Sequence, residues 1–213
     1  MNRIEKIIKF LNKMYKIKVW KGKSFDVLIG TVLSHRTKDE VSWPASERLF
    51  KSANNPEKMS KLSEKEIVRL IKPVGFYNQK AKRVKQICKT LLEKYNGKVP
   101  YTREELMELP GVGAKTASIV LSYSFGIPTI GVDTHVNKVS QRLGLVPKGC
   151  KPEKTQEVLE KIIPKNLHII INHLFVTFGK NMCRAVMPHC FRCPVYEFCK
   201  YEKKEHYRNL PLK

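Results

Sequence analysis

The sequence predicts an all-α protein built from two interlocked helical lobes. Apolar residues recur at helical spacing along almost all of its 213 residues, and no segment sustains the period-two alternation of a strand. A hydrophobic share of 42% is enough to fill a large core. No long Gly/Ser-rich or Pro-rich linker divides the chain. We therefore expect two lobes joined by short connections.

The expected helices follow one another along the chain. The apolar residues of a first amphipathic helix are Ile4, Ile7, Ile8, Leu11 and Tyr15. Those of a second, nearly apolar and hence buried helix are Phe25, Leu28, Ile29, Val32 and Leu33. Further helices are expected over about 44–52, 63–71, 78–95, 102–109, 113–125, 133–143, 152–163 and 167–180.

Helix boundaries have recognisable chemistry. Thr102 and Glu105 have the spacing of a capping box, and Pro44 suits a first helical turn. The residues expected to break the helices are Gly75, Gly97, Gly126 and Gly144.

Positive charge dominates the composition. Lysine and arginine number 41 against 19 acidic residues, a net charge of +22 with a pI of about 9.8. Such a surface attracts polyanions, although a lysine-rich solubilising surface is the alternative explanation. No apolar run is long enough to span a bilayer, and the first residues lack the apolar core of a signal peptide. We expect a cytoplasmic protein close to DNA.

Residues 109–115, Leu-Pro-Gly-Val-Gly-Ala-Lys, predict a phosphate clamp between two helices. Because Gly111 and Gly113 lack a Cβ, the main chain can turn tightly and press its N–H groups against an anion at the next helix N-terminus. The natural anion is a nucleic-acid phosphate.

Lys115 is a candidate amine nucleophile, and Asp133 is a candidate carboxylate. A lysine of ordinary pKa, about 10.4, is protonated at pH 7, but the positive end of a helix dipole and nearby basic residues favour the neutral amine. Simple phosphate contact is the alternative for Lys115. Asp133 precedes Thr134 and His135 as a helix N-cap would, and capping would fix its carboxylate in place.

Four of the six cysteines crowd into seventeen residues with the spacing C-x6-C-x2-C-x5-C: Cys183, Cys190, Cys193 and Cys199. In a reducing compartment, crowding indicates a metal site. The spacing favours a 4Fe–4S cluster, with a tetrahedral zinc ion and disulfides as the alternatives. Cys88 and Cys150 are expected to be ordinary thiols.

The hairpin with Lys115, the Val132-Asp133-Thr134-His135 element and the four-cysteine loop together resemble the endonuclease III family of DNA glycosylases. The resemblance covers nearly the whole chain, including residues 33–39 and 75–81. It implies the helix-hairpin-helix DNA glycosylase fold with a C-terminal iron–sulfur cluster loop. A six-helix lobe would span 17–128, and a second lobe would combine 1–16 with 129–213, the cluster loop lying at 183–199. DNA would bind between the lobes.

The resemblance implies base-excision repair by a bifunctional DNA N-glycosylase and AP lyase that acts on oxidised pyrimidines in duplex DNA. Lys115 would attack C1′ of the damaged nucleotide and form a Schiff base, and β-elimination would then cut the strand 3′ to the abasic site. Asp133 would assist base departure and proton transfers. The resemblance also favours 4Fe–4S over zinc at the four cysteines.

The same resemblance assigns the contacts with DNA. The backbone of Gly111, Val112 and Gly113 would hold a phosphate. Arg36 and Phe76 stand where the family has a glutamine and a leucine that probe the duplex, and His35 lies next to Arg36.

A noncatalytic helix-hairpin-helix DNA-binding protein is the alternative function, and Lys115 with Asp133 argues against it. The mismatch adenine-removing branch has a glutamate at the position of Thr31, and a threonine cannot replace it as a general acid. We expect the partner to be duplex DNA with damaged bases or abasic sites, in the nucleoid. No membrane partner is expected. Two lobes could enclose a duplex unaided, so we expect a monomer.

Overall fold

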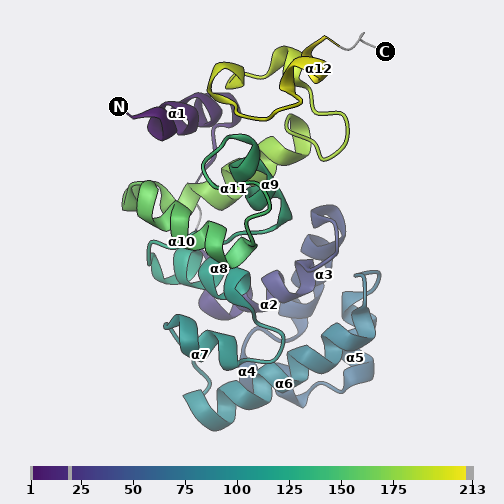
Figure 1. Ribbon diagram of the computed structural model, residues 1–213. Coiled ribbons are helices and arrows are strands. Elements are labelled where there is room, and N and C mark those ends of the chain that lie inside the picture. The colour runs from purple at the N-terminus through teal and green to yellow at the C-terminus, as the bar shows by residue number, and fades with distance from the viewer. Residues whose placement is uncertain (1, 19–20, 210–213) are drawn as a thin grey trace. The chain divides into compact units, whose positions relative to one another are not determined.

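The computed structural model describes residues 2–18 and 21–209, and within these ranges every regular element is a helix (Figure 1). The all-α prediction is confirmed. The chain divides into two compact units, one formed by the N-terminal helix and the residues from Pro128 onward, the other by the intervening residues up to Ile127. Each unit has its own hydrophobic core.

The unit that ends at Ile127 contains the hairpin. Its helices are α2 (Ser24–Ser34), α3 (Asp39–Ser52), α4 (Pro56–Lys61), α5 (Glu64–Ile71), α6 (Tyr77–Tyr95), α7 (Arg103–Glu108) and α8 (Ala114–Phe125). The nearly apolar α2 is buried as predicted, and it packs against α8, α3 and α6. This central helix leads directly into the loop that carries His35 and Arg36.

Two predictions for this unit were wrong. Pro44 lies inside α3 and not in its first turn, because the helix begins five residues earlier with the acidic pair Asp39 and Glu40. The short helix α4 was missed, since six residues are too few to show a helical period; Asn55 caps it by accepting a hydrogen bond from the Lys58 N–H at 2.8 Å.

Three of the four predicted break glycines follow helix ends with a positive φ: Gly97, Gly126 and Gly144. Each adopts the left-handed region in which only glycine is free of strain. Gly75 differs, because a Cβ there would lie 3.1 Å from the Arg36 carbonyl oxygen. It allows two loops to approach each other.

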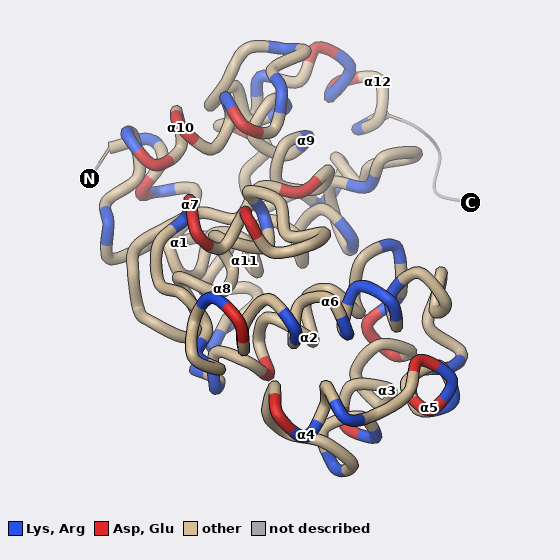
Figure 2. The backbone as a smooth tube through the Cα atoms, turned by 90° about the horizontal axis from the view of Figure 1, so that it is seen from below, with Lys and Arg blue, Asp and Glu red and all other residues tan. Residues whose placement is uncertain are grey.

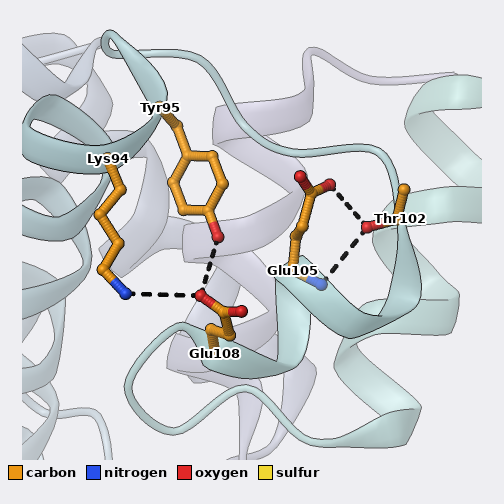
Figure 3. A network of polar contacts seen from close by, with 5 residues as sticks. All are labelled: Lys94, Tyr95, Thr102, Glu105 and Glu108. Atoms are coloured by element: carbon orange, nitrogen blue, oxygen red, sulfur yellow. Dashed lines mark hydrogen bonds and ion pairs between the residues drawn. The ribbon is translucent and has the colours of Figure 1, made fainter.

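The helix leading into the hairpin is anchored at both ends (Figure 3). Thr102 Oγ1 accepts from the Glu105 N–H at 3.3 Å and donates to the Glu105 carboxylate at 2.5 Å. The predicted capping box is therefore confirmed only in its first half, because the carboxylate bonds the hydroxyl. At the other end, Glu108 accepts from the Tyr95 hydroxyl at 3.1 Å and pairs with Lys94 at 3.5 Å. These contacts join α7 to the end of α6.

The other unit contains α1 (Arg3–Tyr15), α9 (Thr134–Arg142), α10 (Pro152–Ile162), α11 (His168–Asn181) and α12 (Lys204–Arg208), with 3-10 turns at Lys165–Leu167, Cys190–Arg192 and Tyr196–Phe198. Helix α11 packs against α9 and α1 and buries Phe175 and Phe178. The five-residue α12 was not predicted. None of the helices in the described ranges is both long and apolar enough to cross a bilayer.

Candidate active site

The two glycines of the hairpin have different tasks. Gly111 has φ of +76°, and a Cβ there would lie 2.9 Å from Cδ of Arg83. Gly113 is the N-cap of α8 with φ −105° and ψ −178°, an extended conformation open to any residue. No described atom outside its chain neighbours lies within 4 Å of a Cβ built at Gly113. Thus the fold itself requires glycine at 111, but not at 113.

The N-terminus of α8 suits an anion. Gly113 has no side chain to cap the helix, so the positive end of the α8 dipole is left without a side-chain cap at this position. The Val112 side chain is buried, 6% exposed. Only the backbone of Val112 is therefore available for the predicted contact with a phosphate.

Lys115 lies in the first turn of α8, half-buried. The next residue, Thr116, places its Oγ1 3.0 Å from Nε2 of His35. Burial, followed by the charges of Lys115, Lys80 and Arg83, lowers the pKa of His35 to about 4. The imidazole is therefore neutral at pH 7, and it adds no positive charge to the surroundings of Lys115.

Arg36 and Phe76 form an exposed pair on two neighbouring turns. Both have left-handed backbones, with φ of +50° and +57°. The Arg36 guanidinium lies 5.9 Å from the centroid of the Phe76 ring, which is 55% exposed. Bulky residues with positive φ are strained, and such strain is concentrated at functional sites. Neither the helix ends nor the core requires these two side chains.

Asp133, in the other unit, caps α9. Its Oδ1 accepts hydrogen bonds from the N–H groups of His135 and Val136, both at 2.9 Å. The predicted capping geometry is confirmed, and it fixes the orientation of the carboxylate. The ring of His135 packs on α11, where a Cβ at Gly179 would lie 3.0 Å from its Nδ1.

The four clustered cysteines line one cavity of about 360 Å³, a volume that includes space open to solvent: Cys183, Cys190, Cys193 and Cys199. Burial raises the pKa of Cys193 to about 12 and that of Cys190 to about 11, so ionisation of these thiols needs a nearby cation. Within the described part of the chain, no three His, Cys, Asp or Glu side chains form a site for a single metal ion.

Arg142, on α9, ties the cysteine loop to that helix. It donates to the Cys183 sulfur at 3.5 Å and to the Arg184 carbonyl at 2.7 Å, and its guanidinium lies 4.3 Å from the Tyr201 ring centroid. The sequence pattern predicted no role for Arg142. No local signal marks it, because its partners lie more than forty residues away along the chain.

Lys80 is the second residue that sequence analysis missed. It is 2% exposed, and its Nζ donates to three oxygens near the Arg36 turn. Its burial could have been inferred from the sequence. Lys80 precedes the buried Val84, Ile87 and Leu91 at helical spacing and so lies on the apolar face of α6.

Positive charge is distributed over both units. Figure 2 shows lysine and arginine on most helices and loops of each unit, with acidic residues fewer and interspersed. A net charge of +22 gives the chain a general attraction for polyanions. Sequence selectivity would have to come from the local geometry described above.

Comparisons with known proteins identify the family of this chain. The family profile described as "HhH-GPD superfamily base excision DNA repair protein" matches residues 29–165. The chain is 44% identical to endonuclease III of Thermotoga maritima over 180 residues, 84% of each protein. It is 38% identical to endonuclease III of Escherichia coli over 180 residues, 84% of this chain and 85% of that protein. The structure of a trapped endonuclease III–DNA covalent intermediate superimposes with a TM-score of 0.87 at 36% identity, covering 97% of this chain and 99% of that one. The chain therefore belongs to the endonuclease III family.

Proposed function

We propose that this protein is a bifunctional DNA N-glycosylase and AP lyase that removes oxidised pyrimidines from duplex DNA. Membership of the endonuclease III family makes it a base-excision repair enzyme of the glycosylase and lyase class. The observation that carries the assignment is Lys115 in the first turn of the hairpin helix, next to the Thr116 hydroxyl and the neutral His35.

The proposed chemistry begins with the Lys115 amine, which attacks C1′ of the damaged nucleotide. The bond from C1′ to the base breaks, and the base leaves with a proton. The sugar ring then opens to a Schiff base with the lysine nitrogen. Loss of a proton from C2′ expels the 3′ phosphate oxygen, which cuts the strand, and water finally releases the lysine.

Asp133 is proposed to assist base departure and proton transfer. Its carboxylate is held by two N–H groups of the α9 N-terminus, so it needs no reorganisation during the reaction. A fixed negative charge would stabilise a sugar that becomes positively charged as the base leaves.

DNA contacts are proposed at two places in the hairpin unit. The backbone of Gly111, Val112 and Gly113 would hold a phosphate at the N-terminus of α8. Arg36 and Phe76 would enter the duplex where the damaged nucleotide leaves the stack, with His35 beside them. Extrusion costs a few kcal/mol, and an inserted aromatic or guanidinium plane offsets part of that cost.

Family membership implies an iron–sulfur cluster, and the four thiols fit one. Four thiols around a common space match a cubane with one ligand on each iron, whereas a single ion draws its ligands to one point. We propose that Cys183, Cys190, Cys193 and Cys199 hold a 4Fe–4S cluster. Such a group would supply a cross-link and a redox-active centre. Arg184 and Arg192 on the same loop would then be positioned to contact phosphates.

Location and oligomeric state follow from the same proposal. An enzyme whose substrate is genomic duplex DNA acts at the nucleoid, so we place the protein in the cytoplasm with the DNA. Since a single chain carries both Lys115 and Asp133, we propose that it acts as a monomer. A sedimentation coefficient at micromolar concentration that corresponds to a dimer would contradict this.

Borohydride trapping tests the function. Duplexes that carry thymine glycol or an abasic site are incubated with the native protein, Lys115→Gln and Asp133→Asn. We expect a borohydride-stable adduct with both duplexes that requires Lys115 and forms more slowly in Asp133→Asn. An adduct at the abasic site alone would restrict the protein to lyase activity. No adduct with either would favour the noncatalytic DNA-binding alternative.

A further inference from the structure

Lys80 is a buried ammonium whose three donors all point to one loop. Its Nζ donates to the carbonyl of Leu33 at 2.7 Å, the carbonyl of His35 at 2.5 Å and the hydroxyl of Thr37 at 2.9 Å. The side chain is 2% exposed, and all three partners are neutral oxygens. An ammonium is costly to bury unless each N–H is paired, and here each one is.

The Lys80 ammonium replaces a glycine cap at the end of α2. The last carbonyls of a helix lack intrahelical donors, and a glycine just beyond the end often satisfies them through a left-handed turn. In α2 the C-cap is His35, and the left-handed residue after it is Arg36. A cation at the C-terminal end of the dipole stabilises this end while a large side chain occupies the position that usually belongs to glycine.

A second set of contacts joins this turn to the one that carries Phe76. Thr37 Oγ1 accepts from Lys80 and, at 3.2 Å, from the Gly75 N–H. Phe76 is the left-handed N-cap of α6, and Lys80 lies one helical turn later, where its own N–H donates to the Phe76 carbonyl at 3.0 Å. Lys80 therefore holds both strained turns, one through its side chain and the other through its helix.

We propose that Lys80 is a positioning residue for duplex recognition, which fixes the Arg36 turn against the Phe76 turn so that both side chains enter the duplex together. The inference rests on the proposed function. It assigns Lys80 to the step in which the base stack is opened and not to the chemistry at C1′. Duplex DNA requires that step, but single-stranded DNA with the same abasic site does not.

The requirement is for the ammonium and not merely for a long side chain. Burial, and then the charge of Arg83, lowers the pKa of Lys80 to about 8, yet the group still remains mostly protonated at pH 7 and keeps its three donors. A methionine at this position would fill the same space without any donor. Lys80→Met therefore removes the hydrogen bonds while preserving most of the packing.

Lys85 provides the matched control. It lies on the same helix and also caps another helix end, because its Nζ donates to the carbonyls of Ser60 and Leu62, both at 2.6 Å. Lys85→Met thus removes a comparable set of contacts without touching the Arg36 and Phe76 turns. Thr37→Val is a milder second variant that removes only the hydroxyl shared by Lys80 and Gly75.

The experiment compares Schiff-base formation at an abasic site in duplex and in single-stranded DNA of the same sequence. We expect Lys80→Met to lower kcat/KM about tenfold on duplex and less than about twofold on single strands, with Thr37→Val intermediate. Lys85→Met should leave the ratio of the two unchanged. Equal losses on both DNAs, or an equal change of the ratio in Lys85→Met, would overturn the proposal.

A fluorescent base opposite the abasic site gives an independent readout. The duplex carries 2-aminopurine at that position, and the protein carries Lys115→Gln so that it binds without reacting. Binding should increase the fluorescence as the base unstacks. The double variant Lys115→Gln, Lys80→Met should give a smaller increase at saturating protein. An unchanged signal at saturation would overturn the proposal. A native protein that forms no Lys115-dependent adduct on either DNA would instead refute the proposed function.

Discussion

The hairpin and the paired Arg36 and Phe76 turns, all in the same unit, solve opposite problems. The hairpin from Leu109 to Gly113 uses glycine at its left-handed position and exposes its main chain at a helix N-terminus. The Arg36 and Phe76 turns place large side chains in the left-handed region, which costs stability, and the buried Lys80 holds them there. On the proposed function, the hairpin would present backbone to a phosphate, whereas the paired turns would present side chains to the base stack.

The largest effect is expected when the hairpin keeps its backbone but loses its amine. Lys115→Gln should lower strand cleavage by at least about 10³-fold, because glutamine has no nucleophilic amine with which to form the Schiff base. Binding to a duplex with an uncleavable abasic analogue should change less than about threefold, since the phosphate contact remains. Gel-shift titration and cleavage assays measure the two quantities. The exposed Lys82→Gln is the control, and adduct formation by Lys115→Gln would refute the assignment.

A smaller effect is expected from Gly113→Ser, which fills the anion position with the protein's own hydroxyl. Serine is a good N-cap and its Cβ meets no described atom within 4 Å, so the free energy of unfolding should be unchanged or higher. The hydroxyl would compete for the amides of α8, and we expect a Kd for duplex DNA about tenfold higher.

Gly111→Ala is the opposite control for the same turn. A Cβ there would lie 2.9 Å from Arg83 with φ of +76°, so we expect a loss of about 1–2 kcal/mol in the free energy of unfolding. Denaturant titration measures the free energy of unfolding of Gly111→Ala and Gly113→Ser. If Gly113→Ser destabilised the fold as much as Gly111→Ala, the distinction between the two glycines would fail.

Next in size is Arg36→Gly, which relieves strain in the turn after α2. Glycine tolerates φ of +50°, so the free energy of unfolding should rise by about 0.5–1 kcal/mol. Cleavage of duplex substrate should nevertheless fall about fivefold, since the probing side chain is gone. Lys16→Gly, at a left-handed C-cap in the other unit, should give a similar gain in stability without loss of activity. If Arg36→Gly and Lys16→Gly lost the same activity, the loss would come from the relief of backbone strain and not from the missing Arg36 side chain.

The smallest effect is expected from His35→Gln and concerns acid stability. The pKa of His35 is lowered from 6.5 to about 4, so between these values the unfolded chain takes up a proton that the folded protein does not. Stability should therefore fall as the pH drops from 6.5 to 4. Glutamine should remove the His35 part of that loss, about 1 kcal/mol because the ring is only partly buried and solvent screens its charge. Urea titrations across this range test it, with the exposed His173→Gln as control. If His35→Gln lost as much stability between pH 6.5 and 4 as the native protein does, the assignment of a neutral imidazole to His35 would be contradicted.

The sequence alone determined the features that depend on neighbouring residues. Helical periodicity predicted most of the longer helices, and the glycine-rich hairpin, the Asp133 cap and the cysteine spacing are all encoded within a few residues. Local backbone chemistry fixes these elements wherever they occur. The short helices α4 and α12 were not predicted, because tertiary packing decides a short helix more than propensity does. The start of α3 was predicted five residues too late, although its acidic first turn is a local signal.

Only the tertiary structure decided how the two strained turns are held. By composition, a lysine is expected at the surface, and nothing in residues 77–95 shows that Lys80 reaches Leu33 and His35, more than forty residues earlier. The same holds for the neutral His35, whose pKa depends on burial and on three cations that lie far from it in sequence. Both are long-range electrostatic properties, and they exist only once distant oxygens and charges are brought together in a low-dielectric interior.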